Sequence, residues 1–307
     1  MTGEVSYAPL FSVVIPTYER PRQLDACLRA LSAQQYPPSA FEVIVVDDGS
    51  KQPPREIVSR FATNVRVRLL EQRNVGPAAA RNHGASAARG AHVVFTDDDC
   101  QPDPLWLAAL GACVAENPHA AVGGRIENAL PRRLCSTASQ ILIDFLYRYY
   151  NSKTQSSTFL ITANVAFPRL MFEAMGGFDV SFPLAAGEDR DLCERWVGAG
   201  HAMVYTNDAV VAHAHDLNLA SFCKQHFNYG RGAHHLHRAR ARRGVRGFRL
   251  ESLQFYTQLI VAPFRTATTV RSIDLSALLL LSQLSYAVGY ALERVRWSLV
   301  ERKNGER

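Results

Sequence analysis

Apolar runs alternate with amphipathic stretches through the first 116 residues. The runs are short and rich in β-branched residues, as in strands, whereas the stretches between them have apolar residues at helical spacing. The predicted strands are 10–15, 41–46, 65–70 and 92–96, and the predicted helices are 20–34, 77–89 and 102–116. Units of this kind predict an α/β fold, in which helices flank a mostly parallel central sheet. Because ligands of such sheets bind beyond the carboxyl ends of the strands, functional residues should directly follow strands.

The pattern is less regular beyond residue 120. The predicted elements are strands at 121–126, 202–205 and 209–212, helices at 134–150, 189–199 and 217–229, and a further segment at 162–167. We expect the globular part to end near Gly232. The chain then has three parts, which are a globular domain over 1–232, a basic linker over 233–249 and a helical tail over 250–307.

The tail contains an uncharged stretch of 18 residues, 275–292, which is at the lower length limit for a helix that spans a bilayer. Six arginines lie between residues 238 and 249, and the linker has no acidic residue. Such arginines attract anionic lipid headgroups, so we expect the tail to associate with a membrane, either across the bilayer or in its interface. The alternative is a solvated basic loop followed by a helix that packs in the core or in a dimer.

The composition of the chain indicates its cellular compartment and the class of partner that it binds. The chain has 307 residues, 47% of them hydrophobic, and can bury one large core or two modest ones. Its net charge of +6 and isoelectric point near 9.1 favour an anionic partner, which fits lipid, nucleic acid and phosphorylated substrates alike. The six cysteines form no Cys-x-x-Cys pair, and the first ten residues have no apolar core of a secretion signal. We therefore expect a cytoplasmic protein at the inner face of the cell membrane.

Two acidic clusters directly follow predicted strands. Asp47 and Asp48 follow the strand 41–46, where carboxylates can bind a base or a ribose, and an Asx turn is the alternative. The second cluster consists of Asp97, Asp98 and Asp99. Three adjacent carboxylates repel one another unless a cation offsets their charge. Hard oxygen ligands suit Mg²⁺ or Mn²⁺ shared with a substrate diphosphate, and a solvated acidic loop is the alternative.

A predicted helix start lies between these two clusters. Gly76 and Pro77 mark the start, and helix N-termini attract phosphate groups. Arg81 lies one turn inside the helix. It can donate charge-assisted hydrogen bonds to a bound phosphate, or it can pair with Asp47 or Asp97, and the two roles are compatible.

Several motifs follow one another in a fixed order along the chain. They are Val13-Val14-Ile15-Pro16-Thr17-Tyr18-Glu19-Arg20, Val46-Asp47-Asp48-Gly49-Ser50, Asn74-Val75-Gly76 with Arg81-Asn82, Phe95-Thr96-Asp97-Asp98-Asp99, Gly176-Gly177-Phe178-Asp179 and Gly187-Glu188-Asp189-Arg190-Asp191-Leu192. This set, spread over residues 11–232, resembles the family 2 glycosyltransferases. The resemblance implies an A-type nucleotide-diphospho-sugar transferase fold for the domain 1–232. It also implies a metal-dependent enzyme that moves a sugar from a nucleotide-diphosphate donor to an acceptor hydroxyl.

The resemblance assigns roles to single positions. It implies a nucleotide pocket lined by Pro16, Thr17, Glu19 and Asp48. We expect three more residues of the same segments, Asp47, Arg81 and Asp98, to contact the donor. Asp97 and Asp99 would flank the diphosphate and its divalent metal, Mn²⁺ or Mg²⁺. Glu19 departs from the family pattern, because many relatives carry asparagine there.

His213 is a further candidate metal ligand. It follows the predicted strand 209–212, at a point where similar enzymes place a histidine near the diphosphate or the metal. An ordinary surface histidine is the alternative.

Asp189 is similar to the catalytic base of the family, and Glu188 would contact the acceptor or position Asp189. In the expected mechanism, Asp189 accepts the proton of the acceptor hydroxyl as its oxygen attacks the anomeric carbon. One such displacement inverts the anomeric configuration. Membrane proximity points to a lipid-linked acceptor and to a glycan of the cell envelope.

Two other functions fit parts of the sequence. A nucleotidyltransferase acting on sugar phosphates could share the sheet and the acidic metal site, but it would not need Glu188 and Asp189 after the segment 176–179. A nonenzymatic nucleic-acid-binding protein is suggested by the basic linker. However, Phe248 is the only aromatic residue among those arginines, and the acidic motifs would have no role. We therefore expect no nucleic-acid partner.

Overall fold

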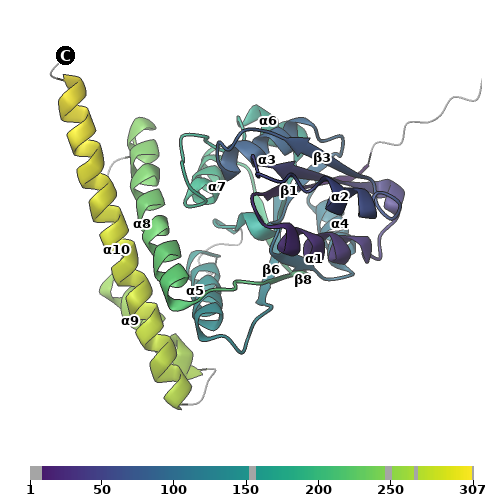
Figure 1. Cartoon of the computed structure of the whole chain (residues 1–307). Coiled ribbons are helices and arrows are strands. Elements are labelled where there is room, and N and C mark those ends of the chain that lie inside the picture. The colour runs from purple at the N-terminus through teal and green to yellow at the C-terminus, as the bar shows by residue number, and fades with distance from the viewer. Residues whose placement is uncertain (1–8, 152–156, 246–250, 266–268, 306–307) are drawn as a thin grey trace, which may run out of the picture.

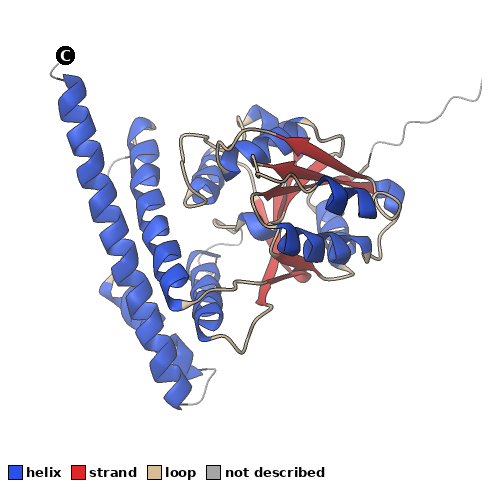
Figure 2. Ribbon diagram, viewed as in Figure 1, coloured by secondary structure: helices blue, strands red, loops and turns tan. Residues whose placement is uncertain are grey.

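A sheet of eight strands forms the centre of the molecule, with helices on both of its faces (Figures 1 and 2). The computed structural model describes residues 9–151, 157–245, 251–265 and 269–305. The strands lie in the order β3-β2-β1-β4-β7-β6-β8-β5. They are β1 Phe11–Thr17, β2 Phe41–Asp47, β3 Val67–Glu71, β4 His92–Phe95, β5 Cys100–Pro102, β6 Ala121–Asn128, β7 Val165–Pro168 and β8 Met203–His213.

The first four strands form an entirely parallel half of the sheet. β1 pairs with β2 and with β4, and β2 pairs with β3, each in parallel register. All seven residues of β2 are buried, as expected for a strand covered on both faces. Thr17 lies beside Asp47 in the register, so the ends of β1 and β2 meet at one edge. The predicted α/β fold is confirmed, and this edge is where the acidic motifs emerge.

The other half of the sheet is mixed. β7 is antiparallel to both β4 and β6, whereas β6 and β8 are parallel. Two predictions are wrong here. The two short strands expected at 202–205 and 209–212 are the single strand β8, whose register against β6 shifts between Gly124 and Arg125. The helix expected from Pro102 begins at Trp106, because Pro102 belongs to β5 and pairs with Val211 of β8.

Helices cover the two faces of the sheet and continue into a helical tail. They are α1 Pro21–Ser32, α2 Arg55–Phe61, α3 Pro77–Ser86, α4 Trp106–Glu116, α5 Leu134–Asn151, α6 Arg169–Ala174, α7 Glu188–Gly198, α8 Leu219–Arg242, α9 Leu253–Val261 and α10 Thr269–Gly305, with short 3₁₀ turns η1 Pro38–Ala40, η2 Thr162–Asn164 and η3 Ala262–Arg265. One apolar core lies between the sheet and α1, α2 and α4. A second core lies on the opposite face, against α3, α6 and α7.

Helix α8 joins the sheet domain to the tail. The boundary expected near Gly232 falls inside α8, which continues to Arg242. The helix does not end at its glycines, because Gly230 and Gly232 are buried where α8 closely approaches other segments. The predicted linker 233–249 is therefore helical as far as Arg242, and residues 246–249 lie outside the described part of the chain. The division of the chain into a domain and a tail stays a prediction.

Arginines near the end of α8 hold α7 in place. Arg240 pairs with Glu194, and Arg243, which caps α8, pairs with Asp191 at 2.5 Å. Asp191 is fully buried and also accepts a hydrogen bond from Arg195 at 2.8 Å. The end of α8 thus stabilises the helix that begins with Glu188 and Asp189.

Candidate active site

The loop after β4 is joined to the loop after β1. Asp98 is buried, and its carboxylate accepts hydrogen bonds from the Thr17 hydroxyl at 2.8 Å and from the Arg20 guanidinium at 3.0 Å. Arg20 also donates to Asp99 at 3.0 Å. Burial raises the pKa of Asp98 to about 6, although Arg20 acts in the opposite direction. Arg20 therefore offsets the negative charge of Asp98 and Asp99, a role that the sequence did not indicate.

Asp99 meets the end of β8. Cys100 pairs with His213 across β5 and β8, and this pairing brings His213 Nε2 to 2.9 Å from Asp99 Oδ1. Burial by itself raises the pKa of Asp99, but His213 and Arg20 outweigh it and hold that pKa well below its usual range. The ring of His215 stacks on His213 with centroids 3.7 Å apart. His213 is therefore a buried partner of Asp99.

These residues fit a divalent cation. Ligand atoms of Asp97, Asp99, Cys100 and His213 all lie within 4.8 Å of one another. Among the described residues, the buried His213 Nδ1 has no hydrogen-bond partner, and Nε2 is the ring nitrogen that faces the Asp99 carboxylate. The two carboxylates supply hard oxygen ligands of the kind that suits Mn²⁺ or Mg²⁺. Burial raises the pKa of the Cys100 thiol well above its usual value, which disfavours the thiolate form that binds metals.

Asp48 organises the segment that leads into α3. Its carboxylate accepts hydrogen bonds from the backbone of Val75 at 3.0 Å and Gly76 at 2.9 Å, and from the Gln72 side chain at 2.8 Å. Gly76 has a φ of +97°, a conformation that side chains other than glycine rarely adopt. The backbone of Asp48 donates to the Thr17 carbonyl at 2.9 Å, which places this segment beside the one that holds Asp98.

Arg81 connects the loop after β4 to α7. It is 3% exposed, and its guanidinium donates to Asp97 and to Glu188, each at 2.8 Å. The pairing that we predicted with Asp97 is present, and the partner across the site is Glu188, 107 residues away in sequence. One buried guanidinium therefore fixes the distance between the loop after β4 and the start of α7.

Two adjacent acids begin α7. Glu188 is buried, whereas Asp189 is half-buried, and Asp189 Oδ1 accepts a hydrogen bond from the Arg190 backbone at 2.7 Å. Burial raises the pKa of both carboxyls, and the charge of Asp97 raises that of Asp189 further. Arg81 thus engages Glu188, whereas Asp189 accepts its hydrogen bond from the backbone of Arg190. The phenol of Tyr229 lies near both acids.

The segment 176–179 is held by two residues of α3. The Asn82 side chain accepts a hydrogen bond from the Phe178 backbone at 2.9 Å and donates one to the Phe178 carbonyl at 2.8 Å. The Arg81 guanidinium lies over the ring of Phe178, 5.7 Å from its centroid. Arg81 and Asn82, which are adjacent in sequence, thus both contact Phe178, and Arg81 also contacts Glu188 at the start of α7.

Three other residues predicted to bind the donor differ in their exposure. Glu19 is exposed, has a φ of +54°, and accepts a hydrogen bond from the Lys51 backbone at 2.8 Å. Asp47 is buried; its Oδ2 accepts from the Ser50 backbone at 3.1 Å, and its Oδ1 has no partner within the described residues. Pro16 precedes Thr17 in β1 and is half-buried. Glu19 and Asp47 therefore shape the turns around the site, and the roles of all three in donor binding stay predictions.

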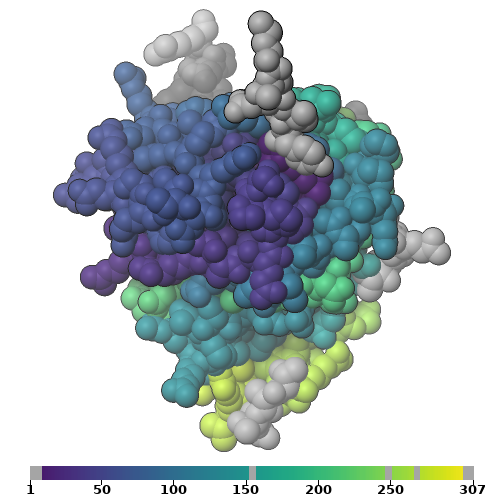
Figure 3. Space-filling model, turned by 90° about the vertical axis from the view of Figure 1, so that its right-hand side faces the viewer, coloured from purple at the N-terminus to yellow at the C-terminus, as the bar shows by residue number. Residues whose placement is uncertain are grey.

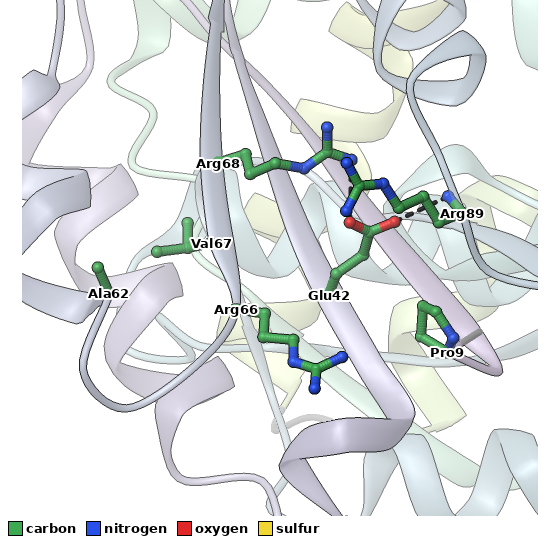
Figure 4. Close-up of a pocket in the computed structure, with 7 residues that line it drawn as sticks. All are labelled: Pro9, Glu42, Ala62, Arg66, Val67, Arg68 and Arg89. Atoms are coloured by element: carbon green, nitrogen blue, oxygen red, sulfur yellow. Dashed lines mark hydrogen bonds and ion pairs between the residues drawn. The ribbon is translucent and has the colours of Figure 1, made fainter. Parts of the chain in front are cut away.

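A hollow of about 270 Å³ lies at the other edge of the sheet (Figure 4). It is lined by Pro9, Glu42, Ala62, Arg66, Val67, Arg68 and Arg89. Glu42 is the second residue of β2 and Val67 the first of β3, so this hollow lies at the amino ends of parallel strands. Arg68 pairs with Glu42 at 2.9 Å within it. It is separate from the acidic site, which follows the carboxyl ends of the strands.

Comparison with known proteins agrees with this geometry. The family model "Glycosyl transferase family 2" matches residues 12–176. The glycosyltransferase AglE of Haloferax volcanii is 30% identical over 230 residues, which cover 74% of each chain. The validoxylamine A glucosyltransferase of Streptomyces hygroscopicus subsp. limoneus is 30% identical over 254 residues, which cover 72% of this chain but 56% of that protein.

Solved structures show the same fold. The mannosyltransferase PcManGT from Pyrobaculum calidifontis, in complex with GDP-Man and Mn²⁺, has a TM-score of 0.61 at 21% identity, with 96% of this chain and 81% of that chain covered. Residues 1–349 of S. aureus TarS, in complex with UDP-GlcNAc, have a TM-score of 0.54 at 16% identity, with 94% and 91% covered. The resemblance found in the sequence motifs is confirmed, and this chain belongs to glycosyl transferase family 2.

Proposed function

We propose that this chain is an inverting glycosyltransferase that moves a sugar from a nucleoside-diphosphate donor to an acceptor hydroxyl, with Asp189 as the base. The observation that carries the proposal is the Arg81 guanidinium, which joins Asp97 to Glu188 at 2.8 Å on each side. It holds the loop expected at the diphosphate next to the acid expected at the acceptor. The bond that forms between the acceptor oxygen and the anomeric carbon, and the bond that breaks between this carbon and the diphosphate, would then lie between two parts of one rigid network.

Asp189 removes the acceptor proton in this proposal. Its raised pKa supports the role, because a base with a higher pKa binds the transferred proton more strongly. Glu188 acts as a positioning residue, since its carboxylate is engaged by Arg81. A single displacement from the side of Asp189 inverts the anomeric configuration.

The donor side is proposed to bind the nucleotide through the segments of Thr17, Asp48 and Asp98. Asp97, Asp99 and His213 would hold a divalent cation, Mn²⁺ or Mg²⁺, which when bound neutralises charge on the departing diphosphate. Complexes of the structural neighbours with GDP-Man and Mn²⁺ and with UDP-GlcNAc support a nucleotide-sugar donor. Thr17 and Arg20 keep the Asp98 carboxylate fixed beside these ligands.

We also propose that the enzyme works at the inner face of the cell membrane, on a lipid-linked acceptor. Support comes from α10, in which Val270–Leu299 is long and apolar enough to cross a bilayer, with a mean hydropathy of 1.5. Only 22% of its apolar window is buried inside the protein, whereas the core helix of a soluble protein is mostly buried. The basic residues of α8 and of the segment after it agree with an anionic surface.

A panel of nucleotide-sugars tests the activity. We expect Mn²⁺-dependent release of nucleoside diphosphate from one of them, and a loss of turnover of roughly 10²- to 10⁴-fold in Asp189→Asn with donor binding retained in calorimetry. Asp208→Asn, which alters an exposed carboxylate of β8, is the matched control. Unchanged turnover in Asp189→Asn rejects the proposed base. Release of pyrophosphate instead of nucleoside diphosphate would assign the site to nucleotidyl transfer.

A further inference from the structure

Helix α10 has one face against the protein and one face without a partner in the described part of the chain. Leu275, Leu279 and Gly289 are buried against α5, α8 and α9. The opposite face, here called the outer face, consists of Ile273, Leu280, Leu284, Val288, Leu292 and Val295. Each of these six side chains is more than half exposed. At 100° per residue they occupy a sector of about 120°, and they extend over about 33 Å of the helix.

The outer face points away from the rest of the molecule. In Figure 1, α10 is the outermost element, and α8 lies between it and the sheet domain. Figure 3, in which the right-hand side of Figure 1 faces the viewer, shows the N-terminal half in front and part of the tail behind it at the lower edge. No charged residue occurs between Asp274 and Glu293. The outer face is therefore a continuous apolar surface on the outside of the protein.

Packing against α8 decides how a bilayer could meet this surface. A Cβ atom on Gly230 of α8 would lie 1.9 Å from the Tyr286 carbonyl oxygen, and one on Gly289 would lie 2.0 Å from that of Phe227. The two backbones are thus in direct contact. Arg238 of α8 also lies over the ring of Trp297, 3.9 Å from its centroid. Helices α8 and α10 therefore run side by side along most of the length of the outer face.

This partnership is incompatible with a spanning α10. The Arg231 side chain of α8 pairs with buried Glu293 of α10 at 2.7 Å, and Arg240 pairs with Glu194 of α7. If α10 crossed the hydrocarbon, these ion pairs and the charged face of α8 would enter it as well. Charged side chains inside a bilayer are strongly disfavoured. A helix with one apolar face and one charged neighbour can instead lie in the plane of the interface.

The net charge of the tail indicates which kind of membrane surface the outer face would bind. Residues 233–307 contain 13 Lys and Arg and 5 Asp and Glu, a net charge of +8, whereas residues 1–232 contain 21 and 23, a net charge of −2. Exposed Arg294 and Arg296 lie about 100° to either side of the centre of the outer face. From there their guanidinium groups can reach phosphates while the leucines enter the acyl region. A sector of this width exceeds the narrow seam of a two-stranded coiled coil, which favours lipid over a second copy of the chain.

We propose that the outer face of α10 binds an anionic membrane in the plane of its surface, with α8 and the sheet domain on the cytoplasmic side. This inference specifies the membrane association proposed above and is independent of the glycosyl-transfer chemistry. It also places the acceptor side near lipid: a Cβ atom on Gly187, next to Glu188, would lie 3.2 Å from the Gly232 carbonyl of α8. One helix thus separates the start of α7 from the helix on the membrane.

Vesicle flotation of the full-length chain tests the proposal. We expect flotation with vesicles that contain phosphatidylglycerol, and at least tenfold less with phosphatidylcholine alone. Leu280→Glu combined with Leu284→Glu should lower flotation at least tenfold, whereas the matched control, Leu170→Glu with Val180→Glu on the exposed surface of the sheet domain, should not. In the absence of lipid, both variants should keep the wild-type rate of donor hydrolysis to nucleoside diphosphate, which separates lost membrane binding from a lost fold or a wrong activity.

Two further measurements separate the modes of binding. Alkaline carbonate should release an in-plane chain from membranes of producing cells, and protease added to the cytoplasmic side should remove a C-terminal epitope tag. Resistance to carbonate together with protection of the tag would overturn the in-plane mode in favour of a spanning helix. A chain that does not float, but forms a dimer that the Leu280→Glu and Leu284→Glu changes dissociate, would assign the outer face to a second copy.

Discussion

Replacing Arg81 with methionine removes the cation that Asp97 and Glu188 share. Methionine keeps most of the apolar stem of arginine, so Arg81→Met removes the charge and both hydrogen bonds with little loss of packing volume. The side chains of Arg81 and Glu188 are each 4% exposed, and that of Asp97 is 25% exposed. Water can therefore replace the lost partner at Asp97 but not at Glu188.

The expected cost follows from this burial. Breaking a buried ion pair by removing one partner costs about 3–5 kcal/mol, because the remaining charge stays desolvated and unpaired. A matched control is Arg29→Met, which breaks an i,i+4 pair with Asp25 in which the arginine is 65% exposed. Such exposed helical pairs contribute about 0.3–0.5 kcal/mol. The two variants should differ by several kcal/mol in the free energy of unfolding.

Denaturant unfolding at several pH values measures the difference. In Arg81→Met, the pKa of Glu188 in the folded protein should rise further above its unfolded value, because burial now acts without the opposing guanidinium. The folded state then binds a proton more tightly than the unfolded state, so stability is retained at low pH and lost as the pH rises through the folded pKa. The destabilisation should be larger at pH 8 than at pH 5. Adding Glu188→Gln should recover part of the loss and remove its pH dependence.

An Arg81→Met variant that loses no more stability than Arg29→Met would refute this reasoning. So would a loss that is equal at pH 5 and pH 8, because the unpaired Glu188 carboxylate would then not be its source.

Three more outcomes are expected. Gly230→Ala should destabilise the protein by about 1–3 kcal/mol in thermal or denaturant unfolding, since the new methyl group would overlap the Tyr286 carbonyl, whereas Gly198→Ala, with open space around it, should not. Asp99→Ala should weaken Mn²⁺-dependent donor binding in calorimetry by more than the roughly 10- to 100-fold typical of lost outer-shell partners, and equal affinity with and without Mn²⁺ in the wild type would contradict the metal site. The acid limb of the pH profile of kcat/KM should lie above the usual pKa range of aspartate, because the pKa of Asp189 is raised and activity is lost as the pH falls through that pKa. If the acid limb persists unchanged in Asp189→Asn, it belongs to another group.

The parallel half of the fold was predictable from local pattern. Strands β1, β2 and β4 are buried on both faces and are read directly as apolar β-branched runs. The mixed half was not predictable in this way. Whether 202–212 is one strand or two depends on its pairing with β6 and β5, which are distant in sequence. Likewise, α8 continues past Gly230 because the Tyr286 backbone packs against that glycine, a contact with no local signal.

The candidate site also has a part that local pattern predicts and a part that it does not. Acidic residues at strand ends were identified because parallel topology brings such ends together. The cations that organise them were harder to assign, since Arg20 and Arg81 act through partners 78 and 107 residues away. Composition gave one usable hint, namely that three adjacent carboxylates require positive charge nearby. That hint predicts a metal, and the structure adds a guanidinium beside the proposed metal ligands.

The arginines at the end of α8 set a practical limit on how far the protein can be shortened. A tail-free enzyme that stops at Gly232, where the sequence places the domain end, would lack the side chains of Arg240 and Arg243. Asp191 would then lose one of its two cationic neighbours inside the protein, at the first turn of the helix that begins with the proposed base. A soluble version intended for crystallisation or kinetics should therefore keep the chain at least through Arg243, and poor activity of a shorter one would say nothing about the lipid requirement of the enzyme.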